Sequence, residues 1–77
     1  MEAKYYKDKE SHFFYKILNE SRFIKITNFK HIFGIENIEN PFIIEDVIEE
    51  CIVIDNDTFV KVYFTVLNKL NKTFVKL

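Results

Sequence analysis

The chain has 77 residues, enough for one small domain. Hydrophobic residues make up 48% and charged residues 30% of it, at a formal net charge of −1, which excludes a disordered acidic or basic tail. No apolar run reaches the roughly 18 residues of a membrane span, no signal-peptide pattern opens the chain, and the single cysteine allows no internal disulfide. We therefore expect one cytoplasmic domain over residues 1–77, with residues 1–9 frayed and no membrane partner.

The composition argues against an enzyme. Only one glycine and one proline occur, whereas phosphate-binding loops and hydrolase nucleophile turns need several glycines to bring backbone close to the ligand. Residues with A/T-rich codons, such as Ile, Lys, Asn and Phe, are abundant, which points to a low-GC bacterium, its phage or another mobile element. Nine Phe and four Tyr are many for so small a core, so we expect surplus aromatics at an interface.

The spacing of apolar residues over residues 9–20 fits either a helix or a hairpin. Two apolar pairs lie four residues apart: Phe13 with Ile17, and Phe14 with Leu18. That spacing favours a helix. In the alternative, a strand at residues 14–18 turns through residues 19–21 into the next segment.

That next segment predicts a strand followed by a short turn. Arg22–Thr27 is rich in β-branched residues, which predicts a strand. Thr27 or Asn28 is suited to cap one helical turn through Phe33, and Gly34 would end it.

The clearest expected element is a helix over residues 41–50. Asn40 is a good N-cap, and Pro41 suits the first helical position. At 100° per residue one arc is apolar: Ile43, Ile44, Val47, Ile48 and Cys51. The opposite arc is acidic, and only Phe42 departs from this pattern. Because Cys51 lies on the apolar arc, we expect its thiol to be buried.

The end of the chain predicts a three-stranded antiparallel meander. Its expected parts are a strand at Cys51–Ile54, a turn at residues 55–57, a strand at Thr58–Leu67, a turn at Asn68–Lys72 and a strand at Thr73–Leu77. In the long strand, Val62 and Phe64 would point into the core. The expected fold is α+β: a small antiparallel sheet of three or four strands with one or two helices on one face.

No residue cluster predicts a metal, a cofactor or a catalytic group. His12, His31 and Cys51 are the natural zinc or nucleophile candidates, but no two of them lie within ten residues of each other. Counted from Asp55, a calcium loop would need glycine at its sixth position and glutamate at its twelfth, where the chain has Val60 and Val66. We expect none of these sites.

The distribution of charge is the unusual feature. Residues 35–57 contain eight acids and no Lys or Arg, while residues 58–77 contain four Lys and no acid. Like charges four residues apart, and acids at a helix C-terminus, are both unfavourable. The acids expected to bind a partner are Glu39, Glu45, Asp46, Glu49, Glu50, Asp55 and Asp57. The alternative is a solvated face without a role.

The leading functional expectation is a small inhibitor, encoded by a phage or mobile element, of the anti-defence or immunity type. Its acidic face would occupy a basic surface of a partner protein, such as a nucleic-acid-handling enzyme. A first alternative is a nucleic-acid-binding regulator that uses Lys4, Tyr5, Tyr6, Lys7 and Lys9. A second is a homo-oligomeric structural subunit, and we expect a homodimer through a sheet edge at Thr73–Leu77.

Overall fold

The computed structural model describes residues 3–75 and has an α+β fold. Within these residues the elements, in chain order, are β1 (Lys4–Lys7), β2 (Phe13–Ile17), β3 (Arg22–Phe29), β4 (Ile32–Glu39), α1 (Pro41–Glu50), β5 (Ile52–Ile54) and α2 (Asn56–Val75). The strands form one antiparallel sheet in the order β4-β3-β2-β1-β5. The predicted class is confirmed, with five strands in the described chain rather than three or four.

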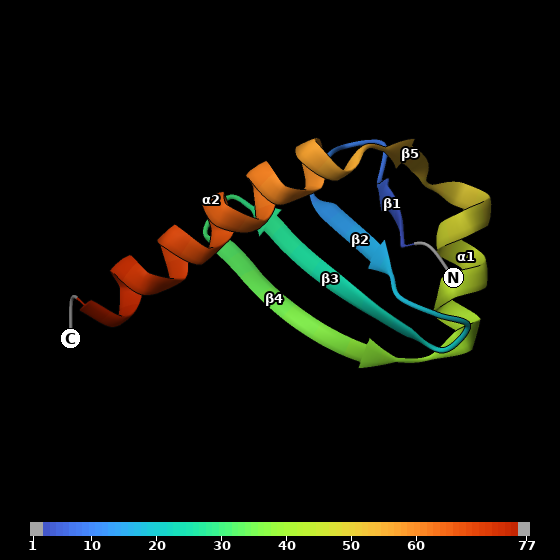
Figure 1. The fold of residues 1–77 in the computed structure, drawn as a ribbon. Coiled ribbons are helices and arrows are strands. Elements are labelled where there is room, and N and C mark those ends of the chain that lie inside the picture. Colours follow the sequence, from blue (N-terminus) through green and yellow to red (C-terminus); the bar gives the residue numbers. More distant parts are fainter. Residues whose placement is uncertain (1–2, 76–77) are drawn as a thin grey trace.

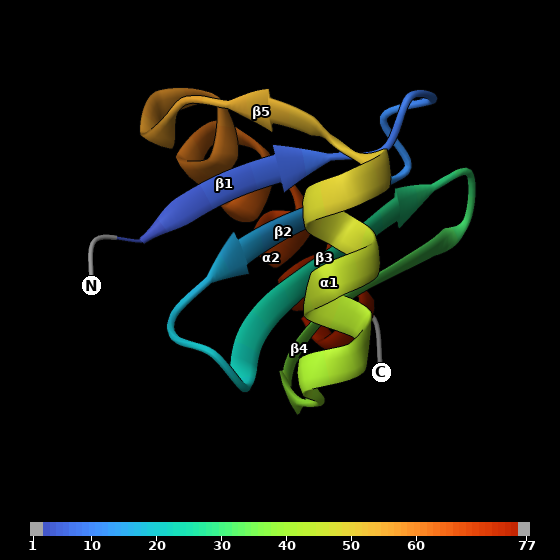
Figure 2. The ribbon, with the colours of Figure 1, turned by 90° about the vertical axis from the view of Figure 1, so that its right-hand side faces the viewer.

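The two helices lie on opposite faces of the sheet (Figures 1 and 2), so the prediction that the helices pack on one face is wrong. On one face, Ile44 and Val47 of α1 pack with Tyr6, Ile17 and Phe23 in a cluster that we call the α1 core. The other face is covered by α2, whose Phe59 and Val66 pack with Phe14 and Ile26 in the α2 core. Neighbouring strand residues therefore enter different cores, because successive side chains point to opposite faces.

The helix favoured over residues 9–20 is wrong, and the hairpin alternative is right. Phe14 packs toward α2 while Ile17 packs toward α1, so β2 is apolar on both faces and shows no simple alternation. Asn19 forms the following turn by accepting hydrogen bonds from the backbone amides of Ser21 and Arg22, each at 2.9 Å. Residues 4–7, expected to fray, instead form β1 between β2 and β5.

The helical turn expected near Thr27 is also wrong. Phe29 pairs with Ile32 in a β3–β4 hairpin, and Lys30 at the turn has a left-handed φ of 53°. A lysine gives no turn signal in the sequence, since this conformation favours Gly, Asn or Asp. Gly34 lies inside β4, pairs with Thr27 and has no positive φ.

The C-terminal meander is wrong apart from its first strand. β5 confirms the strand predicted near residues 51–54, but Asp55 is the residue before a 20-residue helix, α2, rather than part of a hairpin turn. Residues 58–72 and Thr73–Val75, predicted as strands and a turn, all lie in α2; residues 76–77 lie outside the described chain. The proposed dimer edge at Thr73–Leu77 therefore does not exist as a strand over residues 73–75.

The helix reverses the predicted burial at the start of α2. Phe64, expected in the core, is 54% exposed, whereas Phe59, an odd number of residues away and so on the other side of the predicted strand, is buried. Val62 is half-buried and packs at the edge of the α2 core. These positions follow from helical spacing, because Phe59, Val66 and Leu70 recur at intervals of seven and four residues.

Candidate functional site

The outer face of α1 carries the candidate site. Asn40 begins the helix by accepting hydrogen bonds from the amides of Phe42 and Ile43, and Ile44 and Val47 anchor it to the sheet. We name the exposed side the acidic–aromatic face and define it as Phe42, Glu45, Asp46, Glu49 and Glu50. The predicted helix over residues 41–50 is confirmed.

Phe42 lies on this face but is uncharged, so the charge pattern alone does not include it among the site residues. Glu45, Asp46 and Glu49 follow it by three, four and seven residues, so all four side chains share one stripe of the helix. The ring is 76% exposed, the most exposed of the large hydrophobic side chains over residues 3–72. Its departure from the amphipathic pattern was the sequence signal for this position.

The four carboxylates of α1 make no ion pair with another described residue. The last turn of the helix carries no base, and its Cys51 cap is followed by β5. Glu49 and Glu50 thus meet the negative end of the helix dipole, where acids are disfavoured by about 0.3–1 kcal/mol each. The face holds unneutralised charge around one aromatic ring.

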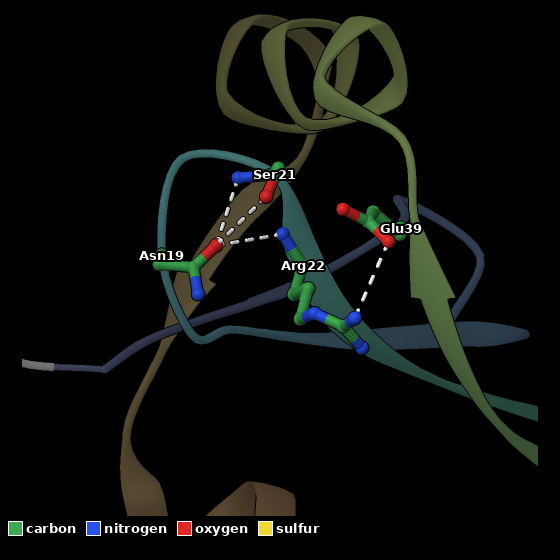
Figure 3. Close-up of polar contacts among 4 residues, drawn as sticks. All are labelled: Asn19, Ser21, Arg22 and Glu39. Atoms are coloured by element: carbon green, nitrogen blue, oxygen red, sulfur yellow. Dashed lines mark hydrogen bonds and ion pairs between the residues drawn. The ribbon is translucent and has the colours of Figure 1, made fainter.

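The other three predicted acids lie outside α1. Glu39 ends β4, where its carboxylate contacts the Arg22 guanidinium at 3.3 Å (Figure 3). Asp55 accepts a 2.8 Å hydrogen bond from the Thr58 amide, and Asp57 lies in the first turn of α2. The structure therefore divides the predicted set, and only the α1 acids form one face.

Asp55 caps the N-terminus of α2. Hydrogen bonds from the side chain and the backbone amide of Thr58 lower the pKa of Asp55. Its stabilising effect is therefore present above the ordinary carboxyl pKa and is lost as the pH falls through the lowered value. The turn composition of residues 55–57 reflects this cap.

In the N-terminal basic segment one aromatic ring is buried and the other is half-buried. Tyr6 is buried in the α1 core, and Tyr5 packs against Phe59 with 5.4 Å between ring centroids. Lys7 Nζ donates a 3.0 Å hydrogen bond to Ser11 Oγ, while Lys4 and Lys9 are exposed. Because the two rings are packed against core residues, they are poorly placed to stack on nucleic-acid bases.

An apolar cleft of about 560 Å³ adjoins the acidic–aromatic face. Tyr6, Ile17 and Ile44 line it together with Ile48, which is 54% exposed. Glu45 contributes from the acidic–aromatic face itself. The sequence did not show this cleft, because its walls come from β1, β2 and α1.

Cys51 lies half-buried at the other end of α1, beside the α1 core. It lines a second cleft with Asp8, Tyr15 and Glu50. Burial, then the charges of Asp8 and Glu50, raise the pKa of the thiol, and burial followed by Cys51 and Asp8 raises the pKa of Tyr15. Both groups are therefore neutral at physiological pH.

We expect iodoacetamide to alkylate Cys51 several-fold more slowly in the folded chain than in urea at pH 8, because only the thiolate reacts. The half-maximal rate should occur at a higher pH in the folded chain. Asp8→Asn should shift it back down while keeping an oxygen for the turn amides of His12 and Phe13. Mass spectrometry over pH 7–10 measures the alkylation rates. Equal pH–rate profiles for the folded and the unfolded chain would contradict the raised pKa of Cys51.

The described residues contain no group of three or more His, Cys, Asp or Glu side chains arranged to hold a metal ion. His12 packs on Phe29 with 4.2 Å between ring centroids and lies 3.3 Å from Glu10. His31 is exposed in the β3–β4 turn, far along the chain from Cys51. Neither helix has the length and apolarity required to cross a membrane.

Comparisons with protein-family models, with curated proteins and with solved structures return no match for this chain. What the protein binds is therefore inferred from its own surface. The acidic–aromatic face, with the apolar cleft beside it, is the strongest feature of that surface.

Proposed function

We propose that this chain is a non-enzymatic inhibitor whose acidic–aromatic face occupies a basic surface of a partner protein. The observation that carries the proposal is the position of Phe42, 76% exposed among acids that have no cation partner in the described chain. Interface hot spots are typically aromatic anchors surrounded by a ring of contacts that exclude water. Carboxylates around such an anchor would steer it toward a basic surface.

The arrangement also has a cost that solvation alone does not offset. Glu45 with Glu49, and Asp46 with Glu50, are like-charge pairs worth about 0.2–0.5 kcal/mol each against the helix. Exposing Phe42 gives up the burial of a large ring. A small domain that keeps both features is accounted for if the face binds a partner.

A nucleic-acid-handling enzyme is the partner class that fits best, because such enzymes carry the basic surfaces that bind phosphates. Together with the A/T-rich codon composition, this supports an anti-defence or immunity role for a phage or mobile element acting in the host cytoplasm. An inhibitor of this type would compete with nucleic acid for the basic surface.

The test is a triple substitution, Glu45→Gln, Asp46→Asn and Glu49→Gln, compared with Phe42→Ala. We expect the triple variant to bind the partner with an on-rate at least 10-fold lower at low salt, because steering is lost. Phe42→Ala should instead raise the off-rate at least 10-fold, as expected for an anchor. Surface plasmon resonance measures both rates, using the partner recovered from host lysate on immobilised wild-type chain.

A charge-matched control makes the same change of three charge units on the exposed β4 residues instead: Glu36→Lys and Asn37→Lys. It has the same net charge as the triple variant, so it separates a local face from a general charge effect. We expect the control to bind like wild type, and the triple variant to be at least as stable as wild type. Unchanged binding by the triple variant and by Phe42→Ala would refute the proposal.

A further inference from the structure

The edge strand β5 is paired on one side only. It follows α1 through Cys51 and pairs with β1, with Val53 opposite Tyr6. It is the last strand in the sheet order, so no described strand lies along its outer side (Figure 2). Ile52 is 45% exposed and Val53 is 70% exposed.

This edge has only one of the usual protections against strand addition, its short length. Proteins commonly protect edges with very short strands, lysine, proline, a bulge or a covering element, and β5 consists of three β-branched apolar residues with no lysine or proline. The opposite edge, β4, differs because it carries Glu36, Asn37 and Glu39 and α2 packs across it. The open edge of the sheet is thus also its most apolar one.

Acids flank β5 at both ends. Glu49 and Glu50 precede it, Asp55 and Asp57 follow it, and no Lys or Arg occurs between residues 49 and 57. All four acids are exposed. A segment that adds to this edge would therefore gain from apolar residues at its centre and cations at its ends.

We infer that β5 accepts an added strand from the partner, namely an extended apolar segment with Lys or Arg at both ends. The inference rests on the proposed function and specifies the partner's chemistry. Val53 is opposite Tyr6, which packs in the α1 core, so its side chain lies on the α1 face of the sheet. One partner could therefore contact α1 and extend the sheet at β5.

A second copy of the chain fits this edge poorly. Antiparallel pairing of two β5 strands centred on Val53 would bring Glu49 and Glu50 of one copy near Asp55 and Asp57 of the other. Parallel pairing would align each acid with its own equivalent. Like charges directly opposite one another destabilise strand pairing, so the charges favour a basic partner over self-association.

The test uses a synthetic peptide of alternating valine and threonine with two lysines at each end. We expect it to shift the backbone amide signals of Ile52, Val53 and Ile54 in the intact ¹⁵N-labelled chain and to slow their hydrogen exchange at least 10-fold at saturation. A version N-methylated along its pairing edge should not bind, because it cannot donate the ladder hydrogen bonds. A version with glutamate ends should bind at least 10-fold more weakly.

Two outcomes would overturn the inference directly. One is that the lysine peptide leaves the β5 amides unchanged or shifts only α1 signals. The other is that the N-methylated peptide binds equally well. Amide shifts at β5 that grow with protein concentration, without peptide, would assign the edge to a second copy and would also overturn it.

Variants separate this inference from the proposed function. Val53→Lys should abolish peptide binding, whereas Val53→Thr, which keeps a β-branched residue, and Ile32→Lys on the β4 edge should retain it. If Val53→Lys binds the partner normally while Phe42→Ala does not, the inference fails and the proposed function stands. If Val53→Lys loses the partner while Phe42→Ala binds normally, the edge is the site and the role of α1 fails. Circular dichroism verifies that each variant is folded.

Discussion

Phe23→Ala should lower the free energy of unfolding by about 3–5 kcal/mol, the range for truncating a core phenylalanine. The Phe23 side chain is 0% exposed and packs between β2 and α1. A cavity there would remove contacts from the sheet and the helix at once. Small domains are stable by about 5–15 kcal/mol, so a large part of the stability would be lost.

Urea unfolding followed by circular dichroism measures this effect, and Phe42→Ala is the matched control. It makes the same change on a ring that is 76% exposed, so its stability should stay within about 0.5 kcal/mol of wild type. Similar losses for the two variants would contradict the described core. The control also shows that any binding defect of Phe42→Ala is not caused by unfolding.

Phe59→Ala should likewise cost about 3–5 kcal/mol, whereas Phe64→Ala should cost less than about 1 kcal/mol. Both residues lie in α2, but Phe59 is 4% exposed and packs over the sheet while Phe64 is 54% exposed. The same urea unfolding experiment compares the stability losses of these two variants within a single helix. A larger loss for Phe64→Ala than for Phe59→Ala would indicate that this segment is the predicted strand, in which Phe64 points inward.

The sequence could predict α1 and β3 because their signals are local. The Asn40 cap, the proline that follows it and the apolar arc all lie within the helix itself. For α2 the local signals conflict: its valines alternate as in a strand, while Phe59, Val66 and Leu70 follow helical spacing. Packing over the second face of the sheet decides between them, and that face is not visible in a single segment.

The candidate site, too, could be predicted from the sequence only in part. Its charge could be predicted, since the acids of residues 45–50 share an arc of a well-defined helix. Their grouping with Glu39 and Asp55 could not be judged, because an ion pair with Arg22 and a cap on Thr58 depend on tertiary structure. Phe42 departed from the pattern, and its role as the exposed centre of the acids appears only once the buried side of α1 is known.

The position of β1 has a consequence for the order in which the chain can fold during synthesis. β1 is made first, yet one of its two neighbours, β5, is made only after residue 51. The four strands up to Glu39 can pair through successive hairpins as they leave the ribosome, but both faces of that meander wait for their helices. Until α1 and α2 emerge, Phe23 and Ile26 have no helix to cover them, so the nascent chain passes through a stage in which it exposes both future cores.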